Sequence, residues 1–176
     1  AGGVGSAAVQ LAKSIGSTVI AVANTDEKKE FCKSLGADFV LGYENLKANL
    51  FELTNNQGID VVYDPVGGDV FRESLRCLRW GGKYMIIGFA NGKIPSLPIN
   101  IALIKGVDIM GVRAGEYFRQ FPHKKKNATA RLFQIAKSGS ITPKIHSSLP
   151  LSQAIVALKM IEHRKAMGRI ILKPTE

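Results

Sequence analysis

Short runs of β-branched and apolar residues alternate with amphipathic segments along the chain, and this alternation limits the fold more than any other feature. The apolar side chains recur at helical spacing in four segments, residues 4–15, 26–35, 46–53 and 70–78. The strand-like runs are residues 18–22, 39–41, 60–64, 83–88 and 107–112. Strands that alternate with helices are typical of a parallel sheet with helices on both faces. The sequence therefore predicts an α/β domain with a doubly wound parallel sheet.

The chain opens on Ala1-Gly2-Gly3-Val4-Gly5, immediately before the first predicted helix. Glycines let a backbone turn tightly and approach a pyrophosphate, and the free N–H groups and dipole of the following helix hold its charge. A glycine turn alone is weak evidence for such a site. Here, however, a helix, a strand and a polar end to that strand follow it at the right distances. We therefore predict a Rossmann-like dinucleotide site at Gly2, Gly3, Val4 and Gly5. The strand that normally precedes such a loop is absent, so we expect a sheet that lacks its first strand and leaves ladder groups without partners.

The strand of residues 18–22 would be the second strand of a complete dinucleotide-binding fold, and it ends on neutral residues. An acid at this position would bind the ribose hydroxyl of NAD. Asn24 and Thr25 come first, and Thr25 is a predicted N-cap that places Lys28 in the first helical turn. A lysine there opposes the helix dipole unless it meets an external phosphate. Asn24, Thr25 and Lys28 thus favour NADPH over NADH. The alternative is an ordinary cap followed by a solvated lysine.

Composition gives further expectations about location and partners. The net charge of +10 could attract nucleic acid or a polyanionic cofactor, but the basic residues are scattered apart from Lys124-Lys125-Lys126 beside His123, which we interpret as a solvated loop. Cys32 and Cys77 are interpreted as buried helical thiols in a reducing setting. No apolar run could span a membrane and no secretion signal is present, so we expect a cytoplasmic protein, or alternatively a mitochondrial one.

No side chain has the pattern of a catalytic group, and we leave the catalytic residues unassigned. His146 and His163 lack the spacing of metal ligands, and no metal site is predicted. Asp60 and Asp64 are interpreted as a strand-end acid and a turn residue. This is what hydride transfer predicts, because the cofactor carries the chemistry and the protein positions it.

Several motifs together resemble one family, the zinc-free, zeta-crystallin-like quinone oxidoreductase branch of the medium-chain dehydrogenase/reductases. They are the glycine loop with Gln10-Leu11-Ala12-Lys13, Leu35-Gly36-Ala37-Asp38, residues 60–68, Trp80-Gly81-Gly82-Lys83, Ile87-Gly88-Phe89-Ala90, Pro150-Leu151 and residues 167–172. The resemblance implies NADPH-dependent reduction of a quinone or another activated alkene or carbonyl, without a metal.

The resemblance also assigns further cofactor contacts. It implies that Tyr43 joins Lys28 at the adenosine phosphate, and that Val66 and Gly67 lie beside the ribose. The residues expected to meet the nicotinamide end through backbone groups are Gly88, Phe89, Ala90, Val112 and Arg113. For Tyr43 the alternative is a half-buried strand-end tyrosine, and for the glycines of residues 67–68 it is a turn and helix start.

The resemblance implies a domain organisation as well. Residues 1–140 would form the NADP(H)-binding domain, incomplete at its N-terminus, and residues 141–176 a C-terminal segment of a GroES-like catalytic domain that this chain lacks. This stretch alone would then be catalytically incompetent. An apolar edge strand over residues 107–112 is expected to make a homodimer.

Other functions stay open at this point. An enoyl or alkenal reductase of the same superfamily is the first alternative. A non-catalytic NADPH-binding protein, structural or RNA-binding, is the second, although nucleic acid is not the expected partner. A methyltransferase also uses a glycine loop, but Asn24 argues against it, since that fold favours an acid at the second strand end.

Overall fold

The computed structural model describes residues 1–174. The chain separates into two compact units, one made of residues 1–41 and 128–176 and the other of residues 42–127. The predicted division into domains near residue 140 stays a prediction. Every strand pair in residues 1–174 is parallel, which confirms the predicted α/β class.

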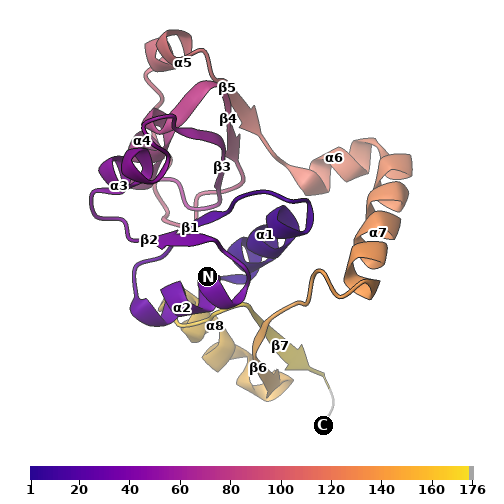
Figure 1. Cartoon of the computed structure of the whole chain (residues 1–176). Helices are drawn as coiled ribbons and strands as arrows, with labels where there is room; N and C mark the ends of the chain where they lie inside the picture. Colours follow the sequence, from indigo (N-terminus) through magenta and orange to yellow (C-terminus); the bar gives the residue numbers. More distant parts are fainter. Residues whose placement is uncertain (175–176) are drawn as a thin grey trace. The chain divides into compact units, whose positions relative to one another are not determined.

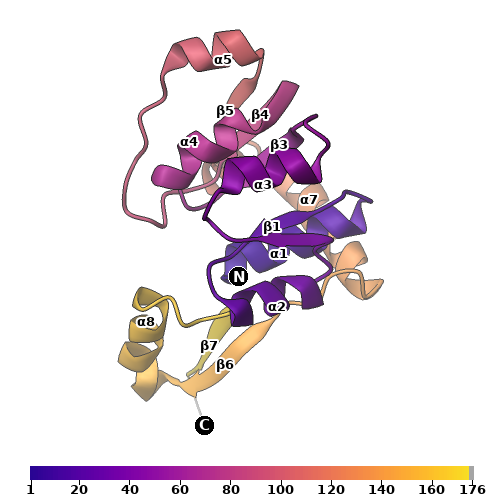
Figure 2. The same cartoon turned by 60° about the vertical axis from the view of Figure 1, so that its left-hand side comes forward.

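The first unit begins with two helix–strand steps. Helix α1 (Gly3–Ser14) leads to strand β1 (Ile20–Val22), and helix α2 (Asp26–Ser34) leads to β2 (Phe39–Leu41). β1 and β2 pair in parallel with Ala21 opposite Val40, and α2 lies alongside both strands (Figure 2). The core of this part contains Val9, Ala21, Ala23, Cys32, Leu35 and Ala37.

The last part of the chain completes the first unit. Strand β6 (Ile145–Pro150) is followed by a short 3-10 turn, η1 (Leu151–Gln153), helix α8 (Ala154–Glu162) and strand β7 (Arg169–Lys173). β6 and β7 pair in parallel, and α8 lies beside them (Figure 1). An isolated parallel bridge joins Gly2 to Gly168, so the end of the chain reaches the opening glycine loop.

The second unit is a three-stranded sheet with the order β3-β4-β5. Its elements are α3 (Leu46–Leu53), β3 (Ile59–Asp64), α4 (Asp69–Arg76), β4 (Leu78–Ile86), α5 (Ile99–Lys105), β5 (Asp108–Gly111) and α6 (Ala114–Gln120). α3 and α4 lie side by side (Figure 1). Helix α7 (Pro122–Lys137) then carries the chain back into the first unit.

The two thiols belong to different cores. Cys32 on α2 is 2% exposed in the first unit, and Cys77 after α4 is fully buried in the second. Burial raises the pKa of the Cys77 thiol to about 11, and the nearby Glu73 carboxylate contributes in the same direction. The prediction of two buried, unpaired cysteines is confirmed.

One sequence prediction about the basic segment is wrong. Lys124-Lys125-Lys126 and His123 lie in helix α7, not in a loop. Pro122 occupies the first helical position, where its missing N–H costs nothing, and Leu132 and Ile135 supply the helical spacing further along. The sequence predicted no element at helices α5 and α6 or at strand β6.

Candidate dinucleotide-binding site

The glycine loop leads into α1 as predicted, with Gly2 as the N-cap and Gly3, Val4 and Gly5 in the first turn. No side chain caps this turn and no acidic residue lies in it. A Cβ built on Gly2 or Gly5 would meet nothing within 4 Å. The start of α1 therefore offers helix N–H groups and a positive dipole end without a competing carboxylate, which fits a diphosphate.

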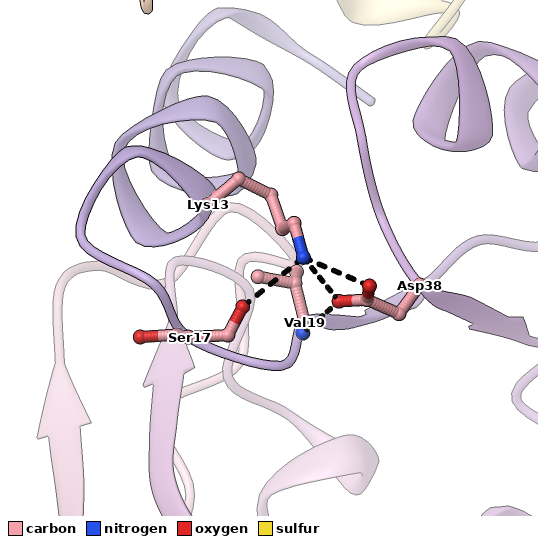
Figure 3. A network of polar contacts seen from close by, with 4 residues as sticks. All are labelled: Lys13, Ser17, Val19 and Asp38. Carbon is pink, nitrogen blue, oxygen red and sulfur yellow. Dashed lines mark hydrogen bonds and ion pairs between the residues drawn. The ribbon is translucent and has the colours of Figure 1, made fainter.

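A polar network fixes the other end of α1 (Figure 3). Lys13 Nζ lies 2.8 Å and 2.9 Å from the two carboxylate oxygens of Asp38 and 3.3 Å from the carbonyl oxygen of Ser17. The backbone N–H of Val19 donates to Asp38 Oδ2 at 2.7 Å. The hydrogen bond from Lys13, followed by that from the Val19 N–H, holds the pKa of Asp38 below its usual range. One carboxylate thus ties α1 to the segments that lead into β1 and β2.

The end of β1 has the predicted cap. Thr25 is the N-cap of α2, and its Oγ1 accepts a hydrogen bond from the Lys28 N–H at 3.3 Å. Lys28 is in the first turn, and its Nζ donates to the carbonyl oxygen of Arg164 at 2.7 Å. Asn24 is exposed between β1 and this cap. The structure thus places Asn24, Thr25 and Lys28 within a single strand-to-helix turn.

In the second unit the parallel register brings three strand ends together. Asp64 of β3 is opposite Ile86 of β4, and Ile86 is opposite Gly111 of β5. The predicted contacts after these strands follow at one edge of the sheet, because parallel strands share their carboxyl edge. They are Val66 and Gly67 after β3, Gly88, Phe89 and Ala90 after β4, and Val112 and Arg113 after β5.

Two of these segments are joined by backbone hydrogen bonds. The Ala90 N–H donates to the Pro65 carbonyl at 3.1 Å, and the Asn91 N–H donates to the Val66 carbonyl at 2.9 Å. The Gly68 N–H donates to the Lys93 carbonyl at 3.1 Å. The turn of residues 65–68 and the loop of residues 89–93 therefore form one backbone structure.

Gly67 is required by this structure. Its φ is +67°, and a Cβ there would lie 2.9 Å from Phe89 Cδ1 and 3.2 Å from the Lys93 carbonyl oxygen. Both the left-handed backbone and the close approach of Phe89 exclude a side chain. Gly68 is the N-cap of α4, so residues 67–68 also form the turn and helix start of the alternative interpretation, and their contact with a cofactor stays a prediction.

The backbone amides expected at the nicotinamide end are partly in use. The Gly88 N–H donates to the Asp64 carbonyl, Ala90 N–H to Pro65, and Val112 N–H to Ile86. Backbone contacts from these three residues to a ligand would therefore use carbonyl oxygens rather than these N–H groups. Tyr43 lies just after β2 and is 40% exposed, in keeping with the half-buried alternative.

Two features near these residues were not predicted. The Arg169 side chain passes over Gly3, with its Nε 3.3 Å from the position that a Cβ would take. Asp64, which the sequence suggested as a turn residue, is instead the last residue of β3, is 7% exposed and accepts hydrogen bonds from the turn that follows it. Within residues 1–174 no group of three His, Cys, Asp or Glu side chains could hold a metal ion, and no helix there is long and apolar enough to cross a membrane.

Known proteins identify the family of this chain. The family model described as zinc-binding dehydrogenase matches residues 3–133. The chain belongs to the zinc-binding dehydrogenase family. Within this family its relatives identify the quinone oxidoreductase branch of the medium-chain dehydrogenase/reductases, which confirms the resemblance seen in the motifs.

Individual relatives of the chain support the same branch. Quinone oxidoreductase-like protein 2 of Bos taurus is 36% identical over 98% of the chain and 50% of its own length. 2-Haloacrylate reductase of a Burkholderia species is 33% identical over 99% of the chain and 53% of its length. The solved Escherichia coli quinone oxidoreductase complexed with NADPH is 31% identical, with a TM-score of 0.90 over 99% of the chain and 55% of that structure. The chain thus spans about half the length of the curated relatives it matches.

Proposed function

We propose that the protein containing this chain is an NADPH-dependent oxidoreductase that transfers a hydride to a quinone or another activated alkene or carbonyl. The observation that carries the proposal is the uncapped, acid-free start of α1 after a glycine loop, in a chain with Lys28 in the first turn of α2. The NADPH complex of the Escherichia coli relative supports the choice of cofactor.

In this proposal each unit contributes its own group of contacts. In the first unit the amides of residues 2–5 bind the diphosphate, and Lys28 binds the 2′-phosphate with Asn24 and Thr25 beside it. A lysine ammonium has three donors, so Lys28 can bind a phosphate while it keeps its bond to the Arg164 carbonyl. That bond also restricts the rotamers of Lys28 before any ligand arrives.

The second unit contributes backbone surface rather than reacting side chains. Val66 and Gly67 contact the ribose, and the carbonyl groups of Gly88, Ala90 and Val112 orient the nicotinamide together with the backbone of Phe89 and Arg113. Tyr43 contacts the adenosine phosphate end. When bound, NADPH supplies the hydride, so the task of these residues is alignment and exclusion of water.

A second substrate class has its own support. 2-Haloacrylate reductase is named for an alkene activated by a carboxylate, and it matches nearly the whole chain. A dedicated enoyl or alkenal reductase is therefore the alternative activity within the same chemistry. The net charge of +10 would favour such an anionic substrate over a neutral quinone by steering.

The experiment is an NADPH-oxidation assay with the full-length protein. A simple quinone, an unsaturated aldehyde and 2-haloacrylate are compared as acceptors, and NADPH binding is measured separately by calorimetry. Binding together with turnover of any acceptor supports the proposal, and the ranking of acceptors decides between the two substrate classes. Binding without turnover of any acceptor favours the non-catalytic NADPH-binding role, and a folded protein that ignores NADPH in calorimetry rejects the proposal.

We also propose that β5 forms the interface of a two-fold homodimer. Within residues 1–174 this strand pairs only with β4, and Met110 on it is 42% exposed. Trp80, Ile99, Leu103 and Ile104 of the same unit are also highly exposed. An open edge beside apolar side chains favours pairing with a second copy. The expected cytoplasmic location stays a prediction.

A further inference from the structure

The Asp64 carboxylate connects the core of the second unit to the turn proposed to contact the ribose. Its Oδ1 accepts hydrogen bonds from the N–H groups of Val66 at 2.8 Å and Gly67 at 3.0 Å. Its Oδ2 accepts one from the hydroxyl of Tyr84 at 2.6 Å. Both oxygens are therefore engaged, one on the turn and the other on a side chain of the neighbouring strand β4.

Tyr84 lies entirely in the core. It is 0% exposed, and its ring meets the ring of Phe71 edge-on at a centroid distance of 4.9 Å. Its hydroxyl lies 3.2 Å from Ser74 Oγ, which also donates to the Val70 carbonyl at 2.6 Å. Burial raises the pKa of Tyr84 far above its ordinary value, and the bond to Asp64 adds to this effect. The hydroxyl thus keeps its proton and remains a donor to Asp64.

This arrangement has a cost that demands an explanation. A buried carboxylate is unfavourable unless donors satisfy its oxygens. Apolar side chains at positions 64 and 84 could pack against Phe71 without any such donors. The turn does not require a charge either, since two amides can be satisfied by a neutral acceptor. What the carboxylate and hydroxyl together provide is a fixed direction for Oδ1, because Tyr84 holds the opposite oxygen.

We propose that Tyr84 is a positioning residue for dinucleotide binding, which acts through Asp64 on the turn of residues 65–68. With Asp64 held by Tyr84, the Val66 and Gly67 amides point inward and the outer surface of the turn is presented in a single conformation. The loop of residues 89–93 is bonded to this turn and follows it. The proposal rests on the NADPH binding proposed above and extends it to a residue that the ligand does not touch.

Tyr84→Phe in the full-length protein is the direct test, because it deletes the hydroxyl and keeps the ring contact with Phe71. The KM and dissociation constant for NADPH should rise by up to about tenfold, because the lost hydrogen bond joins Tyr84 to Asp64 rather than to the ligand and its full size sets the upper limit. NADH should be affected by the same factor, since the proposed contact of the turn does not involve the 2′-phosphate that distinguishes the two cofactors. The kcat at saturating NADPH should stay within about twofold of wild type. Without any cofactor, hydrogen exchange at the Val66 and Gly67 amides should be faster.

Tyr63→Phe is the matched control. Tyr63 precedes Asp64 on β3, is 43% exposed, and its hydroxyl takes no part in this network. It should leave both the NADPH constants and the exchange of the Val66 and Gly67 amides unchanged. If Tyr84→Phe does not accumulate as folded protein, Asp64→Asn takes its place, because its neutral side chain has a similar shape but is a weaker acceptor. It should raise the KM for NADPH and speed exchange of the same amides.

The outcomes separate this proposal from the function beneath it. If wild-type protein binds NADPH and Tyr84→Phe lowers only the melting temperature, with binding and amide exchange unchanged, Tyr84 is a purely structural residue and the proposal is overturned. If the wild-type protein does not bind NADPH, the proposed function fails, and the positioning role fails with it. Coupled changes in exchange and in binding of both cofactors support the proposal.

Discussion

Lys28 Nζ donates a hydrogen bond to the carbonyl oxygen of Arg164 across 136 residues of sequence. The bond holds the cation of the first turn of α2 beside the segment that precedes β7. An isolated lysine on a helix surface would sample many rotamers, and this one is held in place by backbone. It is the kind of fixed cation that recognition of a phosphate requires.

Lys28→Ala is therefore expected to weaken NADPH binding selectively. Loss of a charge-assisted bond to the 2′-phosphate should raise the KM for NADPH at least about tenfold and leave that for NADH unchanged. Steady-state kinetics with both cofactors measure this. Lys29→Ala is the control, because Lys29 is the next residue and pairs with Asp26 on the helix surface. Equal losses for NADPH and NADH would show that Lys28 has no phosphate role.

Gly67→Ala should destabilise the protein, because the residue has a positive φ and its Cβ would meet Phe89 and the Lys93 carbonyl. A non-glycine residue in this backbone region costs about 1–3 kcal/mol, and urea unfolding would measure the loss. Gly115→Ala is the control, since Gly115 lies in α6 with nothing within 4 Å of a Cβ. It should be neutral or slightly stabilising. A Gly67→Ala protein as stable as wild type would contradict the left-handed turn at this residue.

Asp38→Asn should lower the melting temperature in a pH-dependent way. The pKa of Asp38 is depressed in the folded state, so its charge stabilises the fold above the ordinary aspartate pKa of about 3.9. That contribution is lost as pH falls through the depressed pKa. The variant should be less stable than wild type at pH 7, and the difference should shrink in acid and in high salt. Asparagine can still accept from the Val19 N–H, so the test isolates the interaction with Lys13.

Glu30→Gln serves as the comparison for this measurement, since the Glu30 side chain is 70% exposed and pairs with Lys33 on the surface of α2, away from the helix ends. Its melting temperature should follow wild type at every pH. A constant difference between Asp38→Asn and wild type from neutral to acid pH would mean that charge is not what Asp38 contributes.

Met110→Arg tests the proposed dimer. The side chain is partly exposed on the open strand β5, so the fold should tolerate a charge there while two copies of the strand would repel. Sedimentation should find a dimer for wild type at micromolar concentration and a shift toward monomer for the variant. A wild-type monomer under these conditions rejects the interface.

Local signals in the sequence predicted much of this structure. Helices α1 and α2, the Thr25 cap and strand β2 each depend on spacing or on a side chain acting on its own neighbours. Helix α7 escaped prediction because its first turn is a run of basic residues, which is equally typical of a solvated loop. The sequence also predicted which segments follow the strand ends, and these segments lie at one edge of the sheet because parallel strands share their carboxyl edge.

The polar contacts behind the site could not be predicted in this way. Asp64 meets Tyr84 only because β3 and β4 pair in one register, with an irregularity between Ile59 and Val61 that no local pattern indicates. The bond from Lys28 to Arg164 joins the start and end of the chain. Such contacts depend on tertiary packing. From residue spacing alone, Asp64 is indistinguishable from an ordinary turn acid.

Each unit contains one buried thiol whose rate of chemical labelling reports how often that unit opens. Cys32 is enclosed in the first unit and Cys77 in the second, so a thiol reagent added to native protein can modify either only when the surrounding core opens. The raised pKa of Cys77 slows its reaction further until that opening restores an ordinary thiol. Labelling rates read residue by residue would therefore report how readily each half of the chain opens, and whether NADPH slows both rates or only one.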